Sequence, residues 1–259
     1  MSSYLDDLFN LKGKVAAITG GGGFLCGEMA RGYARAGIKV VVLDLRLEKA
    51  EAVRDEILAA GGEAAAGQID VTSKESFEAA LKLTLDSFGR ADILINGAGM
   101  NAPTPVLDIT AEEWDQILKV NIRGTLFGCQ VFGSHMLEQG SGSIINISSA
   151  SAGPPLSKAF TYSVSKAGVR NLTQNIAREW GTRGVRVNAI RPGFFPTEWS
   201  MKHFITPERE AQIKNHTAMK RYGRPDELLG VVLWLASDAA AFVTGAEVTV
   251  DGGFTCMTI

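Results

Sequence analysis

Short apolar runs alternate along this chain with longer stretches in which apolar residues recur every three or four positions. The short runs are rich in β-branched residues and end at glycine, asparagine or aspartate, which is typical of strands buried on both faces of a sheet. The longer stretches have the period of helices that cover such a sheet. Strands are predicted at 14–19, 38–43, 64–69, 91–95, 143–147, 185–190 and 247–250.

This alternation predicts the fold class. Strand–helix–strand units of this length give parallel strands joined by right-handed crossovers. We therefore expect an α/β fold, with a doubly wound parallel sheet of about seven strands. No linker or low-complexity segment interrupts the pattern, so residues 1–259 are predicted to form a single domain.

Four consecutive glycines, Gly20 to Gly23, follow the first predicted strand and precede a helix. Such a turn lets backbone N–H groups approach a diphosphate at the positive end of the helix. Asp44 closes the second strand, where an acid accepts hydrogen bonds from the adenosine ribose hydroxyls and repels a 2′-phosphate. Taken separately, the two features are also typical of a flexible turn and a helix N-cap. Together they predict a dinucleotide site and favour NAD over NADP.

Tyr162 and Lys166 lie four residues apart near the start of a predicted helix, so they share one of its faces. A free tyrosine has a pKa of about 10, and a neighbouring ammonium group favours its phenolate form. Ser149 lies at the end of the preceding strand, from which its hydroxyl can bond a substrate oxygen while Tyr162 transfers a proton. A Tyr-x3-Lys pair alone is also common on solvated helix faces, so its meaning depends on the rest of the chain.

Three further polar residues stand at informative positions. Asp70 follows the third strand and is either an adenine contact or an ordinary turn aspartate. Asn96 ends the fourth strand, at the edge where open α/β sheets bind ligands. Asn121 lies inside the helical pattern at 111–136, where an amide is exposed, bonded to neighbouring backbone, or, less commonly, placed at a kink or a water site.

The composition of the chain excludes several classes of binding partner. The net charge is −2 and the basic residues are dispersed, which argues against nucleic acid and anionic membranes. No apolar run approaches the ~18–20 residues of a membrane span, and the N-terminus lacks the order of a signal peptide. The three cysteines are odd in number and widely spaced, so they are expected to be free thiols in a reducing cytoplasm. Neither the cysteines nor the histidines have metal-ligand spacing, so no metal is expected.

The joint pattern resembles the short-chain dehydrogenase/reductase family from about Leu11 to Gly253. The resemblance rests on Thr19-Gly20 with its glycine run, Asn96-Gly-Ala-Gly99, Asn121, Ser149, Tyr162-x3-Lys166 and Pro192-Gly193. It implies a Rossmann-type fold, a homotetramer and a catalytic tetrad. In that tetrad Tyr162 is the acid/base and Ser149 orients the substrate oxygen. Lys166 lowers the tyrosine pKa and holds the nicotinamide ribose, and Asn121 holds a water.

The resemblance also implies the cofactor contacts. Asp70-Val71 matches an adenine-contacting pair, and Thr197 matches a threonine that reaches the nicotinamide carboxamide. One departure concerns the glycine motif, because Phe24 and Cys26 occupy its second and third glycine places. The expected NAD contacts are Gly20, Gly23, Phe24, Leu25, Asp44, Asp70, Val71, Asn96, Gly97, Tyr162, Lys166, Pro192, Phe195 and Thr197.

The long segment 192–222 is expected to cover the active site. Its Pro-Gly-Phe-Phe-Pro start and the Asp251-Gly-Gly-Phe-Thr ending look like the sugar- and sugar-acid-oxidising branch of the family, which includes proteins like gluconate 5-dehydrogenase and mannonate oxidoreductase. We therefore expect NAD-dependent interconversion of a secondary alcohol and a ketone or lactone on a sugar, sugar acid or polyol. The residues expected nearest this small-molecule substrate are Asn101, Ser151, Glu198, Trp199 and His203.

Two alternatives stay open. β-Ketoacyl thioester reductases share most of this scaffold. A non-catalytic dinucleotide-sensing protein could also use the fold, since fold alone does not confer activity. The intact tetrad counts against the sensor.

Overall fold

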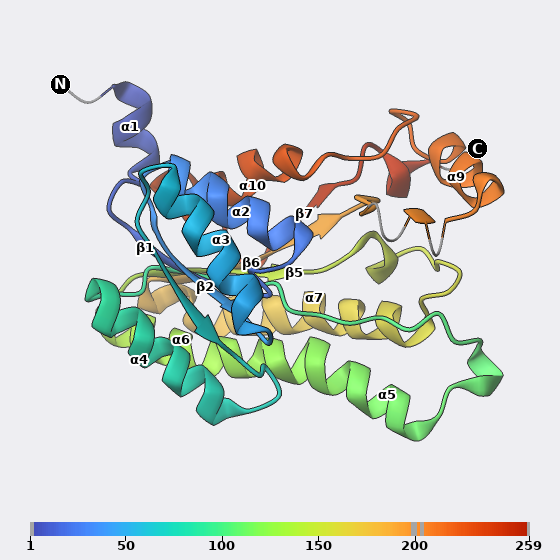
Figure 1. Ribbon diagram of the computed structural model, residues 1–259, viewed down its shortest axis with the longest axis horizontal. Coiled ribbons are helices and arrows are strands. Elements are labelled where there is room, and N and C mark those ends of the chain that lie inside the picture. The colour runs from blue at the N-terminus through green and yellow to red at the C-terminus, as the bar shows by residue number, and fades with distance from the viewer. Residues whose placement is uncertain (1–2, 198–200, 203–204, 258–259) are drawn as a thin grey trace.

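Strands form the centre of the protein (Figure 1). They are parallel and pair in the order β3-β2-β1-β4-β5-β6-β7. The computed structural model describes residues 3–197, 201–202 and 205–257. Glu198, Trp199 and His203, three of the expected substrate contacts, lie outside these ranges. The strands are β1 (Val15–Thr19), β2 (Lys39–Asp44), β3 (Ala64–Gln68), β4 (Ile93–Asn96), β5 (Gly142–Ile147), β6 (Val185–Pro192) and β7 (Glu247–Val250).

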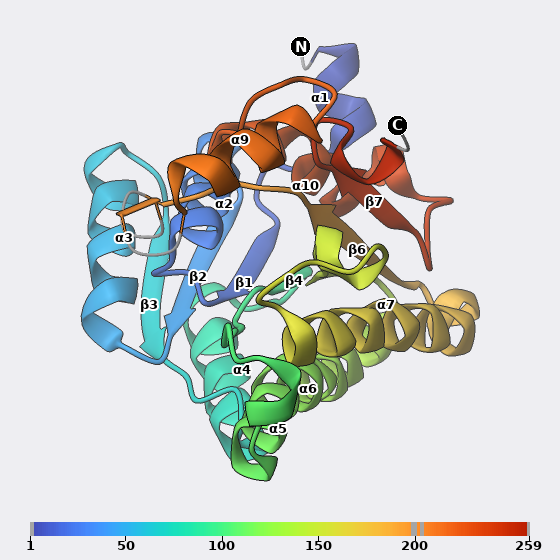
Figure 2. The same ribbon diagram turned by 90° about the vertical axis from the view of Figure 1, so that its right-hand side faces the viewer.

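Helices cover both faces of the sheet, and Figure 2 shows the two helical layers on either side of the strands. One apolar cluster joins the sheet to α2, α3 and α10, and the other joins it to α4, α6 and α7. The α-helices are α1 (Tyr4–Phe9), α2 (Phe24–Arg35), α3 (Leu47–Ala59), α4 (Lys74–Phe88), α5 (Ala111–Leu118), α6 (Gly124–Gln139), α7 (Phe160–Trp180), α9 (Pro207–Asn215) and α10 (Leu229–Ala236).

Strand β1 explains why the predicted runs are apolar at every position. Successive side chains of a strand point to opposite faces of the sheet. Accordingly, Ala16 and Ile18 belong to one apolar cluster and Ala17 belongs to the other. With helices on both sides, every residue of the strand is buried. The predicted α/β class and doubly wound parallel sheet are confirmed.

The helix expected over 111–136 is not continuous. It is divided into α5 and α6 by a π-helical turn at Lys119–Arg123, with Asn121 at its centre. Single π turns are uncommon and often occur at functional sites. The wider turn puts the buried Asn121 side chain against Met100, in the loop after β4.

The order of the strands reverses between β1 and β4, which pair directly. At such a switch point the connecting segments leave to opposite sides and open a crevice at the carboxyl ends of the strands. The predicted site residues follow β1, β2, β3, β4 and β5, so the topology brings them to this one edge. None of the helices in the described part of the chain is long and apolar enough to cross a membrane.

Candidate active site

A cleft of about 1020 Å³ lies at the switch point. Its walls come from the turns that follow β1 to β4, from α7 and from the segment after β6. All the predicted cofactor contacts line it except Asn96 and Pro192. The Asn96 side chain instead faces the core, where its amide donates to Asn146 Oδ1 at 2.9 Å and ties β4 to β5.

The glycine turn gives this cleft an anion-binding wall. Gly20 has a φ of +68°, and a Cβ there would lie 3.0 Å from the backbone of Ala98. Helix α2 then begins at Phe24, and no side chain caps its N-terminus. The first-turn N–H groups of a helix have no partner within the helix. Their positive end therefore suits the diphosphate of a dinucleotide.

The two departures from the glycine motif fit this geometry. The Cys26 side chain packs toward Gly97, where an added Cβ would lie only 2.3 Å from its sulfur. The missing side chain of Gly97 thus makes room for the thiol in place of a third glycine. Burial raises the pKa of Cys26 to about 12, so the thiol is neutral. Phe24 is 47% exposed and lines the cleft, and α2 still begins at this residue.

Asp44 is buried and connects the glycine turn to α3. Its two carboxylate oxygens accept hydrogen bonds from the backbone N–H groups of Gly22 and Arg46, each at 3.1 Å. It is not the N-cap of α3, because that position belongs to Arg46. A carboxylate has about four lone-pair sites, so two bonds leave capacity to accept from a ribose. Arg46 is exposed and lines the same cleft.

Asp70 is exposed at the rim and forms a turn. Its Oδ1 accepts from the backbone N–H of Thr72 at 2.8 Å, and this bond holds the pKa of the carboxyl below its usual range. Asp70 also lines the cleft, so the turn bond and an adenine contact are compatible.

Lys166 and Tyr162 stand together on α7, as their spacing predicts. The ammonium nitrogen of Lys166 lies 5.5 Å from the centre of the Tyr162 ring and donates to the carbonyl of Ile147 at 2.7 Å. Lys166 is 4% exposed, and burial lowers its pKa to about 8. Ile147, the last residue of β5, was not among the predicted site residues. Its role is a backbone contact, which no side-chain pattern reveals.

The prediction that Lys166 lowers the pKa of Tyr162 is wrong for the protein without a bound cofactor. Burial raises the pKa of Tyr162, and a hydrogen bond with Ser149 only partly opposes this. A phenolate loses more by leaving water than this bond returns. The Lys166 ammonium is bonded to the Ile147 carbonyl and does not reverse the effect.

Ser149 is held as a hydrogen-bond donor. Its Oγ accepts from the backbone N–H and the hydroxyl of Ser151, at 3.2 and 3.1 Å. A hydroxyl has two acceptor sites and one hydrogen, so these contacts leave the single Ser149 hydrogen for the bond to Tyr162, which lowers the tyrosine pKa. Ser151, expected to contact substrate, is 3% exposed and its hydroxyl is directed at Ser149. Asn101, also expected near substrate, is exposed at the rim and donates to the Lys158 carbonyl at 3.4 Å.

Asn121 is completely buried and fastens two elements of the site. Its Oδ1 accepts from the N–H of Met100 at 2.8 Å, and its amide donates to the Met100 carbonyl and to Ser165 Oγ, both at 2.9 Å. Of the interpretations left open by the sequence, the structure combines two, a bond to backbone and a helix irregularity. Asn121 and Lys166 are neighbours, since a Cβ on Gly99 would lie 3.3 Å from Asn121 Oδ1 and 3.5 Å from Lys166 Nζ.

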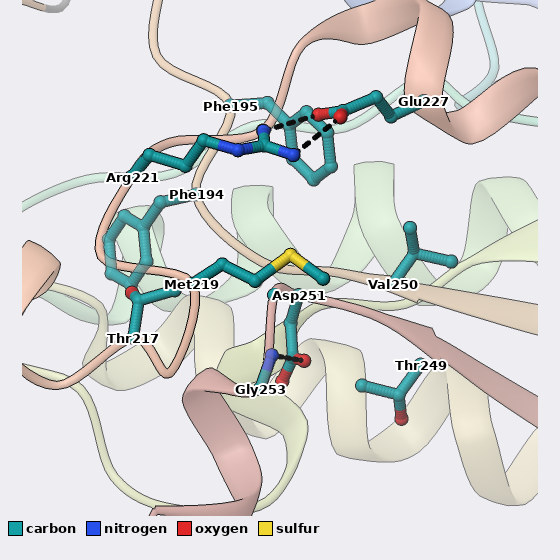
Figure 3. A pocket seen from close by; sticks show the side chains of 12 residues that line it. Phe194, Phe195, Thr217, Met219, Arg221, Glu227, Thr249, Val250, Asp251 and Gly253 are labelled. Atoms are coloured by element: carbon teal, nitrogen blue, oxygen red, sulfur yellow. Dashed lines mark hydrogen bonds and ion pairs between the residues drawn. The ribbon is translucent and has the colours of Figure 1, made fainter.

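A second cavity, of about 340 Å³, lies between the segment after β6 and the turn after β7. Figure 3 shows Arg221 bonded twice to Glu227 on one side, and Asp251 bonded to Gly253 on another. These charged groups are satisfied within the protein. Phe195 lines both cavities and separates this one from the main cleft. In the described ranges, no group of three or more His, Cys, Asp or Glu residues could hold a metal ion.

Comparison with known proteins agrees with the fold. A family model described as "Enoyl-(Acyl carrier protein) reductase" matches residues 25–255. The chain therefore belongs to the short-chain dehydrogenase/reductase family, whose members are oxidoreductases acting on CH–OH groups.

Particular relatives are similar over nearly their whole length. The uncharacterized oxidoreductase UxuB of Bacillus subtilis is 43% identical, with 95% of this chain and 96% of that protein covered. D-threitol dehydrogenase of Mycolicibacterium smegmatis is 38% identical, with 95% of each covered. A gluconate 5-dehydrogenase of Burkholderia cenocepacia J2315, solved with NADP and tartrate, superimposes with a TM-score of 0.92 at 31% identity, covering 97% of this chain and all of that one. Other similar structures hold NADH or NAD.

Proposed function

We propose that this protein catalyses reversible, NAD-dependent oxidation of a secondary alcohol on a sugar, sugar acid or polyol. The observation that carries the proposal is the wall formed by Tyr162 and Lys166 in the dinucleotide cleft, with Ser149 hydrogen-bonded to Tyr162. A non-catalytic sensor could use Lys166 as a ribose contact, but it has no need of the hydrogen-bonded Ser149–Tyr162 pair beside it.

Each residue has a role that its contacts support. When bound, the nicotinamide accepts the hydride from the alcohol carbon or returns it. With substrate bound, Ser149 turns its one hydrogen from Tyr162 to the substrate oxygen, since Ser151 occupies its acceptor sites. Tyr162 takes the hydroxyl proton during oxidation and gives it back during reduction. Lys166, with a pKa of about 8, exchanges protons near neutral pH and stabilises the phenolate as it forms.

Asn121 keeps this arrangement in place. Its bonds to Met100 and Ser165 hold the loop after β4 against α7, which carries Tyr162 and Lys166. The family role of holding a water in the proton relay is proposed for it as well.

Asp44 supports the choice of NAD. A carboxylate at this position repels a 2′-phosphate and accepts from ribose hydroxyls. Arg46 is the feature that opposes this choice, because an exposed guanidinium beside Asp44 can pair with a phosphate. The ratio of kcat/KM with NAD to kcat/KM with NADP is therefore the quantity to measure.

The substrate class rests on the mouth of the cleft and on the relatives. Asn101 lines the cleft and donates to the Lys158 carbonyl, and Arg209 of α9 donates to the neighbouring Ser157. A polyhydroxylated substrate needs such partners, since each unpaired hydroxyl costs free energy when buried. The named substrates of two relatives, threitol and gluconate, are of this class. A 3-oxoacyl-[acyl-carrier-protein] reductase of Synechocystis sp., 37% identical, favours a β-ketoacyl thioester instead, and this is the second candidate.

We propose a cytoplasmic homotetramer as the working form. The cysteines Cys26, Cys129 and Cys256 are free, as a reducing compartment requires. Exposed apolar side chains on and before the helices at 111–136 and 158–180, among them Leu107 and Phe160, suit a contact between copies. Light scattering on the purified protein measures the assembly directly.

The test is turnover of NAD and NADP with aldonates, hexoses and polyols, and of NADH with a β-ketoacyl thioester. Tyr162→Phe should lower kcat about 10²–10⁴-fold with little change in the Kd for NADH, because it removes only proton transfer. Tyr4→Phe, on the exposed helix α1, is the matched control outside the cleft and should keep wild-type kcat. Near-normal turnover by Tyr162→Phe would refute the acid/base role. Fastest turnover of the thioester would replace the sugar assignment.

A further inference from the structure

A cluster of charged residues lies behind Ser149, in which Glu247 and Arg191 are largely buried and Arg170 is half exposed. Glu247 begins β7, the edge strand, yet its side chain is only 10% exposed. Its Oε1 accepts a hydrogen bond from Ser148 Oγ at 2.6 Å. Its Oε2 lies 3.6 Å from Arg170 Nε and 3.6 Å from Arg191 Nη1. One carboxylate thus reaches from the edge of the sheet, past β6, to the residue beside Ser149.

Arg191 holds the other side of the same turn. Its side chain is 13% exposed, and Nη2 donates to the Ala150 carbonyl at 3.2 Å. A Cβ on Gly153 would lie 2.0 Å from this nitrogen, so the guanidinium occupies the space under the turn. Its Nε is buried and finds no hydrogen-bond partner within the described ranges.

Burying these charges contributes little net free energy to folding. Removing two charged groups from water costs several kcal/mol per ion, and apolar residues of similar volume are often as stable or better. The unpaired Nε adds to this cost. The cluster therefore indicates a demand for defined geometry at the turn, beyond packing.

We propose that Glu247 and Arg191 are positioning residues for Ser149; this inference rests on the proposed function. They fix the two neighbours of Ser149, one through the Ser148 hydroxyl and the other through the Ala150 carbonyl. Between these anchors Ser149 has an extended backbone, with φ −163° and ψ 155°. This conformation lets Ser151 bond the Ser149 oxygen, and it holds the Ser149 hydroxyl beside Tyr162. A catalytic group misplaced by about 1 Å can cost about 10²-fold in rate.

A merely structural role for the cluster predicts something different. If Glu247 only stabilised the β6–β7 edge, its loss would lower the free energy of unfolding and the affinity for the cofactor together. Its effect on kcat would then add to the effect of any other variant in the site. A positioning role predicts that its loss acts through Ser149. Residues that act on one another give non-additive effects in a double-mutant cycle.

The kinetic test is a cycle between Glu247→Ala and Ser149→Ala. Glu247→Ala should lower kcat about 10–100-fold. The Kd for NADH should stay within about twofold, since no cluster residue lines the dinucleotide cleft. Glu247→Gln should restore most of kcat, because an amide oxygen still accepts from Ser148. In the Ser149→Ala background, Glu247→Ala should change kcat less than about twofold. An equal loss in both backgrounds would overturn the proposal.

A second measurement does not depend on turnover. The Ala152 amide donates to the Ser149 carbonyl at 2.9 Å, so its hydrogen exchange reports the order of the turn. Exchange at residues 150–153 should accelerate in Glu247→Ala and Arg191→Met. It should not accelerate in Glu63→Ala, which removes an exposed ion pair with Lys39. Unchanged exchange in both cluster variants refutes the positioning role, whatever the activity. If exchange is faster in the cluster variants but the wild-type protein oxidises no substrate, the cluster does anchor the turn and the proposed function is rejected.

Discussion

The buried charge of Lys166 has a cost that can be measured as stability. Burial lowers its pKa from 10.5 to about 8. At about 1.4 kcal/mol for each tenfold change in an equilibrium constant, keeping the ammonium in the fold costs roughly 3 kcal/mol at neutral pH. Lys166→Met removes the charge and keeps an unbranched chain. It also removes a charged donor to the Ile147 carbonyl, a loss of about 1.5–3 kcal/mol. The variant should therefore be at least as stable as wild type at pH 7, by up to about 1.5 kcal/mol, and inactive.

The dependence on pH follows from the direction of the shift. Because the folded pKa of Lys166 is lower than the unfolded one, the unfolded chain binds this proton more strongly. The cost is fully present below pH 8 and disappears as the pH rises through 10.5. Wild type gains stability from this group over that window, and Lys166→Met does not. The advantage of the variant should shrink at pH 9 and be lost by about pH 10.5.

Urea unfolding at pH 7, 9 and 10.5 measures these differences, with the slope m checked to be equal in all proteins. Lys74→Met serves as the control, since Lys74 is exposed on α4 and its loss should shift the midpoint little. A Lys166→Met protein less stable than wild type at pH 7 would refute the reasoning. An advantage that stays constant from pH 7 to 10.5 would also refute it, because the cost would then not be that of the charge.

Three further outcomes are expected. Asp44→Asn should raise the ratio of kcat/KM for NADP over NAD at least about tenfold, and should unfold later in urea than Asp44→Ala because it keeps an acceptor for Gly22 or Arg46; an unchanged ratio would reject the role of the charge. Gly128→Ala should lower the free energy of unfolding by about 1–3 kcal/mol, since its Cβ would lie 2.2 Å from Asn96 Oδ1; a variant as stable as wild type would contradict this packing. In the native protein a disulfide reagent should rapidly modify only the exposed Cys256, and the two buried thiols should react after unfolding; fast reaction of all three would be inconsistent with their burial.

Much of this protein follows from local sequence rules. Strands buried on both faces must be apolar at successive positions, so the runs that became β1 and β4 are visible without a structure. Parallel strands present their carboxyl ends at one edge, so residues that follow them can be expected to meet. Tyr162 and Lys166 are neighbours because helix geometry places residues four apart on one face.

Other features depend on contacts that sequence spacing does not encode. The π turn at Asn121 is set by bonds to Met100, in a different loop. Cys26 replaces a family glycine because Gly97, on another strand end, leaves space for its sulfur.

The electrostatics of the site was also decided by the tertiary structure. Sequence spacing placed Lys166 beside Tyr162, but the pKa of Tyr162 is raised. The direction of this pKa shift depends on how much water the fold removes from the phenol. Glu247 contacts Ser148 from 99 residues away in the chain. Local rules therefore determined the strands and the Tyr–Lys pair, and only the packing of distant segments decided how the site is charged and held.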